Sequence, residues 1–450
     1  MSAPGFDAAQ WRARIDARAN SRERWTANIQ GLTRKVRQRR ASQLQRDFTD
    51  YVFNVNELAA RPALVDADTL AAYFTEFGRL AANLGEPAND RQVADGLERA
   101  IAVQRENGGD IAGLCLAKAA FLALRETDSA ERLDAILTAI DVSPTGSDAW
   151  ATAIVALAAY QIEVSRYDDA IGTVARLRTA MPAERYERKF RCASLVYEGM
   201  ARFTSFRDID RAREVLTEAC AYREQADDLA IARWVATAYH YLARIAEVDR
   251  QFQTAIDLYL LGKQFQDRCP EEVEADAFIQ LRIAEPLIAA GIRKLARDHL
   301  DEARRLALAG SNVSSARLQV ELGFATLRAA DGDMREAELL AVEALRMARR
   351  VAFWRGELLC LGYLLVLGIR RRRPDKILAV GFRILGTAFF GELRRNGLLK
   401  LLTRIPVVVP IAVRRMSRRP TAEGEPAVRC DCPLHDRSPT GGRRSTHVTG

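Results

Sequence analysis

The chain has 450 residues, 48% of them hydrophobic, and its formal net charge is +8. This length exceeds the usual single compact core, so it predicts several domains or one elongated repeat array. Glycine (27) and proline (14) are scarce while alanine, leucine and arginine are abundant, a composition that favours helices and suggests a GC-rich bacterial genome. Five of the seven cysteines lie singly in helical patterns, which indicates reduced thiols in a cytosolic protein and not a disulfide framework.

The positive charge is concentrated at the two ends of the chain. Residues 11–46 contain eleven lysines and arginines against two acids, and residues 346–419 contain eighteen against three. The balances are 11 − 2 = +9 and 18 − 3 = +15, so the rest of the chain sums to 8 − 9 − 15 = −16. An acidic middle between two basic ends predicts two kinds of partner surface.

The first sixty residues are predicted to form a basic helical segment, with the densest cluster of cations at 34–40. One interpretation is a solvated capping helix, and the other is a contact with nucleic acid or anionic lipid. No helix-turn-helix glycine, zinc finger or aromatic RNA-binding signature accompanies the cluster. The first thirty residues hold no apolar run of signal length, which predicts a cytoplasmic protein.

A repeat of 40 to 43 residues dominates the middle of the chain. It is marked by seven alanines, and the five from Ala170 to Ala337 are each followed by small or apolar residues four and seven positions later, as on one face of a helix. A second small residue twelve positions earlier and a turn-compatible segment between the two predict a preceding helix in several units. The seven alanines are Ala130, Ala170, Ala212, Ala255, Ala296, Ala337 and Ala379.

Three consecutive units carry small residues with spacings of twelve and seven: Ala243-Ala255-Gly262, Ala284-Ala296-Ala303 and Ala325-Ala337-Ala344. This pattern resembles the tetratricopeptide repeat. The resemblance implies antiparallel helix pairs whose backbones approach closely at the small residues. It covers about residues 110–390. The unit of about 42 residues is longer than the common 34 and is similar to a long-helix variant, while HEAT-like repeats are the structural alternative.

The predicted fold is therefore an all-α solenoid of antiparallel helix pairs over residues 61–350. In tetratricopeptide arrays the first helices of the units line the inner face, and this resemblance implies that aromatic residues there contact a protein partner. Packing in the core explains the same aromatic residues. The candidates for partner binding are Tyr160, Tyr197, Trp234, Tyr239 and Tyr241.

Residues 351–419 combine short apolar runs with clusters of arginine, including the four consecutive arginines 370–373. None of the runs reaches the length needed to cross a bilayer. Short apolar helices flanked by arginine fit docking at an anionic membrane surface, on the inner face of the cell membrane. A last repeat buried in the fold and a protein interface are the alternatives. The predicted surface contacts are Arg370, Arg371, Arg372, Arg373, Arg394, Arg395, Arg414 and Arg415.

Residues 420–450 have few apolar groups and are predicted to form a flexible tail. The tail contains Cys430, Cys432 and His435, whose thiols and imidazole are weak candidates for a soft metal such as zinc. A single residue between the two cysteines is tighter than usual for zinc, and the pair could instead be redox-active.

The chain lacks the phosphate-binding, nucleophile-elbow and zinc-protease motifs, and no set of nucleophile, base and orienting group can be assembled. His240 and His299 are interpreted as ordinary helix residues. The sequence thus predicts a non-catalytic scaffold without a cofactor, which binds a protein partner and docks on a membrane through its C-terminal segment. The alternative is a regulatory protein that contacts nucleic acid through residues 11–46.

Overall fold

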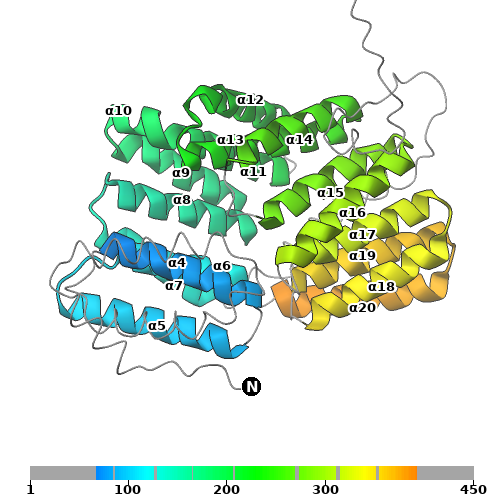
Figure 1. The fold of residues 1–450 in the computed structure, drawn as a ribbon, viewed down its shortest axis with the longest axis horizontal. Coiled ribbons are helices and arrows are strands. Elements are labelled where there is room, and N and C mark those ends of the chain that lie inside the picture. Colours follow the sequence, from blue (N-terminus) through cyan, green and yellow to red (C-terminus); the bar gives the residue numbers. More distant parts are fainter. Residues whose placement is uncertain are drawn as a thin grey trace, which may run out of the picture. The chain divides into compact units, whose positions relative to one another are not determined.

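In the computed structural model, residues 67–392 are described, except for short gaps at 85–86, 126–128, 165, 206–207, 269–272, 311–314 and 351–353. Within these residues the chain folds into helices joined by short turns, and no strand is present (Figure 1). The prediction of an all-α fold built from successive helix pairs is confirmed. The predicted basic segment 1–60 and the tail 420–450 lie outside the described residues.

The chain divides into two compact units, the first comprising residues 1–234 with 308–313 and the second comprising 235–307 with 314–450. In unit 1, α4 contacts α6, and α6–α7, α8–α9 and α11–α12 are packed pairs. Bulky side chains such as Tyr73, Phe74 and Phe77 are fully buried in its first core cluster. The helices of unit 1 are α4 (Ala67–Leu84), α5 (Pro87–Glu106), α6 (Ala112–Arg125), α7 (Ser129–Val142), α8 (Asp148–Glu163), α9 (Tyr167–Ala180), α10 (Ala183–Arg185), the π-helical turn η2 (Tyr186–Phe190), α11 (Arg191–Ser205), α12 (Ile209–Cys220) and the 3₁₀ turn η3 (Ala221–Gln225).

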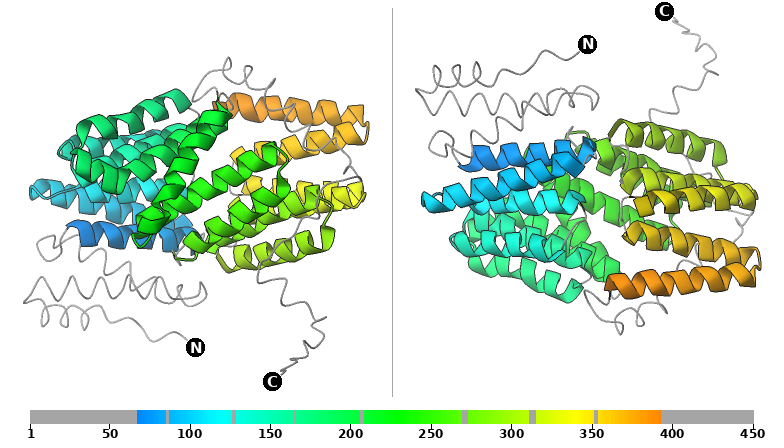
Figure 2. Two further views of the ribbon diagram at one scale, coloured as in Figure 1. Left: turned by 90° about the horizontal axis from the view of Figure 1, so that it is seen from above. Right: turned by 90° about the horizontal axis from the view of Figure 1, so that it is seen from below.

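The described part of unit 2 consists of four helix pairs in chain order, and its boundary with unit 1 falls within α13. Its core combines small residues from both helices of a pair with leucine and isoleucine from the next pair. Figure 2 shows the helices of this unit, from green to orange, packed side by side along their lengths. They are α13 (Leu229–Val248), α14 (Phe252–Gln266), α15 (Val273–Ala289), α16 (Arg293–Gly310), α17 (Ser315–Ala330), α18 (Met334–Arg350), α19 (Trp354–Arg370) and α20 (Pro374–Glu392).

The predicted repeat length agrees with the helix boundaries. From α9 onwards, the second helices of successive pairs begin 42, 43, 41, 41 and 40 residues apart. The fourth residue of each of the first five is an alanine with no exposed surface. These alanines are Ala170, Ala212, Ala255, Ala296 and Ala337.

The alignment on alanine is wrong at the two ends of the array. Ala130 is the second residue of α7 and Ala379 is the sixth residue of α20, and both are exposed. The fourth positions of these helices are instead Arg132 and Ile377. The turn before each helix fixes where the helix begins, so a matched spacing of alanines does not by itself give the buried position.

Small residues at the crossing points let the paired helices approach closely. Ala325 on α17 and Ala337 on α18 both have no exposed surface, as do the equivalent pairs one and two units earlier. A Cβ atom added at Gly262 would lie 3.2 Å from the Tyr239 Cβ and 3.3 Å from the Ala236 carbonyl oxygen. The three small positions of the tetratricopeptide pattern are therefore helix–helix contact points in this fold.

The four turns within the helix pairs of unit 2 share one backbone conformation. Arg250, Gly291, Gly332 and Arg372 have positive φ values of 66°, 82°, 88° and 52°. In each turn the amide of the next residue donates to a carbonyl five residues earlier, as Asp333 does to Arg328 at 2.9 Å. This is the left-handed cap that commonly ends a helix, and it recurs with the period of the repeat.

Candidate functional site

Two of the five aromatic candidates are buried in the core. Tyr160 on α8 is 7% exposed, and the guanidinium of Arg132 lies 5.6 Å from the centre of its ring. Tyr239 on α13 is 6% exposed and stacks on Phe265 with ring centroids 5.7 Å apart. Both rings therefore contribute to helix packing within their own unit.

The other three candidates are partly exposed. Tyr197 on α11 and Trp234 on α13 pack against the core cluster around Trp150 in unit 1. Tyr241 on α13 packs edge to face on His240 at 5.4 Å, and the guanidinium of Arg244 lies 5.9 Å from its ring centre. Among the five, Tyr241 is the aromatic candidate that the structure brings beside polar and charged side chains of unit 2.

A polar cluster lies on the first helices of unit 2, centred on Arg282 of α15. Its Nη1 donates to both carboxylate oxygens of Glu285 at 2.9 and 2.7 Å, and its Nη2 donates to Oε1 of Gln319 on α17 at 3.1 Å. The Nε of Arg282 is buried and has no hydrogen-bond partner in the structure. This guanidinium uses three of its five N–H donors, and its buried Nε is unpaired, so it is a rigid and incompletely satisfied polar group.

A second part of the polar cluster links α13 and α14. Tyr259 Oη donates to Glu247 Oε1 at 2.6 Å, and the Tyr259 ring lies 5.5 Å from that of His240. Burial, together with the charge of Glu247, raises the pKa of Tyr259 well above its usual value. Desolvation, with the positive charges of Arg282 and Arg244, lowers the pKa of His240 well below 6.5. His240 is therefore neutral at physiological pH.

On α13, α15 and α17, exposed side chains occur at equivalent positions of successive repeats. Positions 41 residues apart are partly or fully exposed on all three helices, apart from the buried Gly323. The side chains at these positions are aromatic, cationic, anionic, amide or small. We name this set the first-helix surface: Thr237, Tyr241, Arg244 and Val248 on α13; Phe278, Arg282, Glu285 and Ala289 on α15; Gln319, Thr326 and Ala330 on α17.

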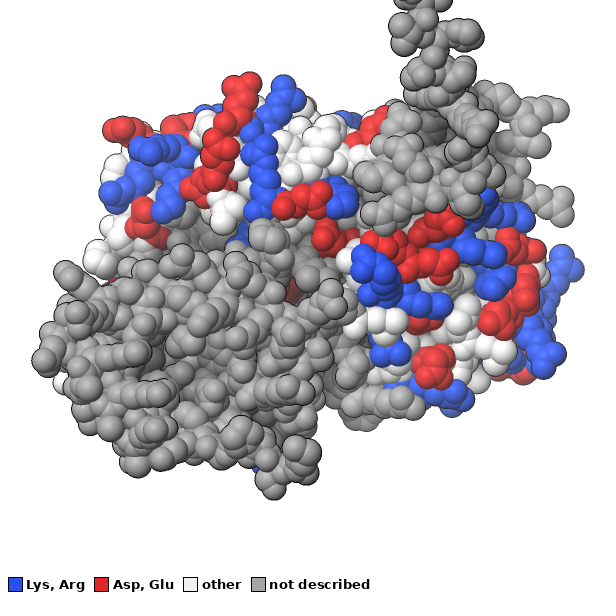
Figure 3. Space-filling model, viewed as in Figure 1, with Lys and Arg blue, Asp and Glu red and all other residues white. Residues whose placement is uncertain are grey.

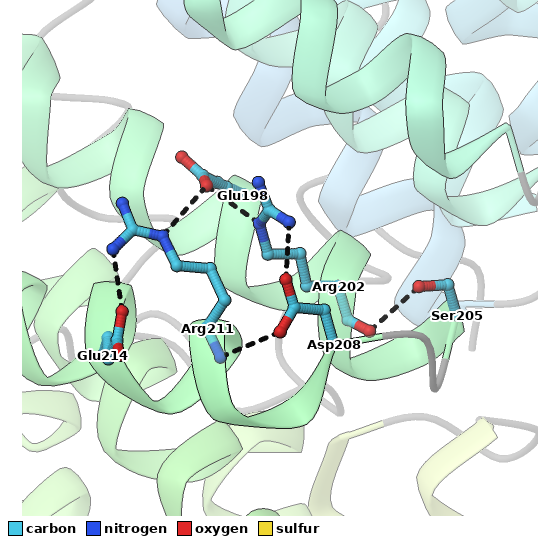
Figure 4. Close-up of polar contacts among 6 residues, drawn as sticks. All are labelled: Glu198, Arg202, Ser205, Asp208, Arg211 and Glu214. Carbon is cyan, nitrogen blue, oxygen red and sulfur yellow. Dashed lines mark hydrogen bonds and ion pairs between the residues drawn. The ribbon is translucent and has the colours of Figure 1, made fainter.

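Unit 1 contains a polar network of a different kind at the turn between α11 and α12 (Figure 4). Arg202 donates to Glu198 at 2.8 Å and to Asp208 at 3.1 Å, and Asp208 caps α12 by accepting from the amide of Arg211 at 3.1 Å. Arg211 in turn donates to Glu214 at 2.8 Å. The arginines and acids pair within the network, so it fixes the helix pair and leaves little charge for a ligand.

The buried His299 is equally well accounted for by packing. It is on α16 with no exposed surface, and its Nδ1 lies 2.7 Å from Oε1 of Gln280 on α15. This hydrogen bond satisfies one buried ring nitrogen and joins two helices of unit 2. The interpretation of His299 as a structural helix residue fits this geometry.

The four consecutive arginines 370–373 lie at the turn between α19 and α20 and are exposed. Arg371 forms an ion pair with Glu338 of α18, and Arg373 is 3.3 Å from Asp375. Within the described part of the chain, the structure records no ion pair for Arg370 or Arg372. No helix among the described residues is long and apolar enough to cross a membrane.

The remaining predicted contacts lie outside the described residues: Arg394, Arg395, Arg414 and Arg415 of the C-terminal segment, and Cys430, Cys432 and His435 of the tail. Among the residues that the structure describes, no group of three or more histidine, cysteine, aspartate or glutamate side chains could hold a metal ion. The predictions about the tail therefore stay predictions.

The aromatic pattern on the first helices does not point to Arg282, Glu285 or Gln319, because these residues are polar. A usable signal was present. Arg282 is 41 residues after Tyr241, and Gln319 is 41 residues after Phe278. Extending the repeat period from Tyr241 and from Phe278 would have pointed to Arg282 and Gln319 on the neighbouring first helices.

Comparison with known proteins adds little to these observations. No family model matches the chain, and no curated protein sequence matches it. Among solved structures it is similar to the crystal structure of the APC/C hetero-tetramer Cut9-Hcn1, with a TM-score of 0.44 and 13% sequence identity. The match covers 84% of this chain and 71% of that chain, and so slight a similarity carries no argument about function.

The class of protein follows from the helix pairs themselves. Paired antiparallel helices with a period near 41 residues, buried small residues at the crossing points and one recurring turn define a tetratricopeptide-like helical-repeat fold. The sequence resemblance to that repeat is confirmed. Helical repeats of this type present an extended surface to binding partners, and the residues on that surface, not the fold alone, determine function.

Proposed function

We propose that this protein is a non-catalytic scaffold that binds a segment of a protein partner on the first-helix surface of unit 2. The observation that carries the proposal is the repetition of partly exposed side chains at matched heights on α13, α15 and α17. A surface built in this way offers an extended partner a series of similar contact sites in one direction.

The chemistry of the surface supports a peptide ligand. Tyr241 and Phe278 supply aromatic area, while Arg282, Glu285 and Gln319 form a pre-ordered set of hydrogen-bonding groups. Aromatic and arginine side chains dominate the affinity of protein interfaces, because they combine a large contact area with directed hydrogen bonds. Ordering these groups before binding lowers the entropy lost on association.

The test is quantitative affinity capture with the full-length chain and a variant of the surface. Ala289→Arg places a long side chain on an exposed position of α15 without emptying the core, and Tyr241→Ala removes the aromatic contact. We expect each substitution to weaken capture of the same partner by about tenfold, as for one interface contact residue.

Leu261→Arg is the matched control, because Leu261 is 38% exposed on α14, a second helix of the same unit. It should leave partner capture unchanged. If all three substitutions weaken capture of the partner equally, or if none weakens it, the partner does not bind the first-helix surface.

We further propose that the C-terminal basic apolar segment docks the scaffold on the inner face of the cell membrane. What supports this is the arginine content of residues 346–419 and the short apolar runs between the clusters. Co-flotation of the full-length chain with anionic vesicles, but not with neutral vesicles, is the expected result. A chain that stays in the soluble fraction with both vesicles contradicts membrane docking.

The alternative proposal is a regulatory role in which residues 11–46 contact nucleic acid. It rests on the eleven cations of that segment, which lies outside the described residues. Salt-sensitive DNA binding that is lost when these cations are replaced by glutamine would favour it. If the chain does not bind DNA even at low salt, the proposed nucleic-acid contact is wrong.

A further inference from the structure

The last helix of the structure presents an unusual exposed face. Leu378 and Phe382 on α20 are 63% and 73% exposed, the highest values among the exposed large hydrophobic residues described. They are four residues apart and therefore lie one turn above each other on the helix. Most exposed apolar side chains occur singly, whereas here two bulky ones adjoin.

The opposite face of α20 is the one that packs. Val380 and Ile384 contact the core cluster that includes Leu361 of α19 and Leu345 of α18. Residues 375, 378, 379, 382 and 383 are all exposed and fall on one arc of the helix. The described side chains of α20 thus divide into a packed face and an uncovered face, on which Leu378 and Phe382 lie between the charged residues Asp375 and Arg383.

Positive charges flank the uncovered face. Arg383 is exposed beside Phe382, and the arginines of the α19–α20 turn lie at the start of the helix. Within the part of the chain that the structure describes, no ion pair is recorded for Arg370, Arg372 or Arg383. Residues 370–383 contain six cations and one acid, Asp375, which is held by Arg373.

We infer that α20 is a membrane-surface helix, in which Leu378 and Phe382 insert among the lipid headgroups while Arg370, Arg372 and Arg383 contact anionic lipid. An apolar strip with a bulky aromatic, bordered by cations, is the composition of helices that lie in the plane of an anionic bilayer interface.

The inference rests on the proposed membrane docking and assigns it to one helix. The insertion of two side chains contributes apolar transfer free energy, and each arginine contributes electrostatic attraction that salt weakens. The two contributions can therefore be separated by experiment.

The test measures partitioning of the full-length chain onto phosphatidylcholine vesicles with and without phosphatidylglycerol. We expect binding to the anionic vesicles alone. Phe382→Asp should weaken it by about tenfold or more, because a largely exposed phenylalanine gains its apolar transfer free energy only on insertion. Phe382→Trp should retain binding, since tryptophan is favoured at the membrane interface.

Replacing Arg370, Arg372 and Arg383 together by serine should weaken binding by about a hundredfold at low salt, or about fivefold per arginine. Leu137→Asp is the matched control, because Leu137 is a 42% exposed leucine on α7 of unit 1. It should bind vesicles like the unaltered chain. Urea unfolding of every variant reports whether the fold is retained.

Three results would overturn the inference. If both the Phe382→Asp variant and the triple serine variant bind vesicles as tightly as the unaltered chain, the protein docks on membranes but α20 does not mediate the docking. A Phe382→Asp chain that binds vesicles normally but unfolds at lower urea shows that another segment of the chain, such as 398–413, covers the face. A chain whose self-association is lost in Phe382→Asp, without vesicle binding in either form, shows that a second copy covers it.

Discussion

The pairs α17–α18 and α19–α20 follow each other in the chain and share the same turn, yet their outer faces differ. In both, the turn residue has a positive φ and the following amide bonds to a carbonyl five residues earlier. The second helix of the first pair buries Ala337 and exposes one large apolar residue, Leu339, whereas α20 exposes Leu378 and Phe382. The backbone geometry of the turn is the same in both pairs, whereas the exposed side chains of the second helices differ.

The first helices show the same contrast. Gln319 and Thr326 on α17 correspond, 40 residues later, to Leu359 and Val366 on α19. The polar cluster of α13, α15 and α17 therefore does not continue into the last pair. Two surfaces of different chemistry, one polar and aromatic, the other basic and apolar, are built on one repeat.

The largest expected effect separates two alanines that the sequence spacing treats as equivalent. Ala337→Leu should lower the free energy of unfolding by about 2–3 kcal/mol, because a buried crossing point has no room for a larger side chain. Ala379→Leu, on the exposed face of α20, should change it by less than about 0.5 kcal/mol. Urea unfolding of both variants measures the difference, and equal effects would mean that the two pairs pack alike.

The second effect tests the polar cluster, which the last pair lacks. The unfolded chain protonates His240 near pH 6.5, whereas the folded chain resists protonation because its pKa is well below that value. The folded state thus binds fewer protons, so stability falls as the pH drops below 6.5. Lowering the pH from about 7.5 to about 5.5 should therefore reduce the free energy of unfolding through this one group by on the order of 1 kcal/mol.

His240→Gln should remove that contribution, so the difference between the two chains should grow as the pH falls. Urea unfolding at both pH values gives the comparison, and subtracting the two chains cancels the titration of other groups. A pH dependence that is identical in both chains contradicts the assignment to His240.

The smallest effect concerns the shared turn. Gly332→Ala should destabilise the fold by about 1 kcal/mol, because a side chain at positive φ is strained. Arg372→Gly should stabilise it by up to about 1 kcal/mol for the same reason. Thermal unfolding would detect both shifts. Opposite signs confirm that the two turns share a conformation, and a destabilised Arg372→Gly chain means that the Arg372 side chain makes a contact that outweighs the strain.

The sequence by itself determined the all-α class, the repeat length and the helix pairs, because these depend on local periodicity and on turn residues such as Gly291 and Gly332. The three small positions were predictable for the same reason: only small residues allow two helices to approach so closely. The alignment of helix starts on alanine failed at Ala130 and Ala379, since the first position of a helix depends on the turn before it.

Tertiary structure decided which side chains face outward. Tyr160 and Tyr239 occupy first helices, as the sequence indicated, but neighbouring helices bury them. Arg282, Gln319 and Tyr259 come together from separate helices, and Leu378 and Phe382 stay uncovered because the other face of α20 makes the packing contacts. Periodicity along one helix fixes which residues share a face, whereas exposure depends on what packs against that face, and this is set by contacts between segments distant in the sequence.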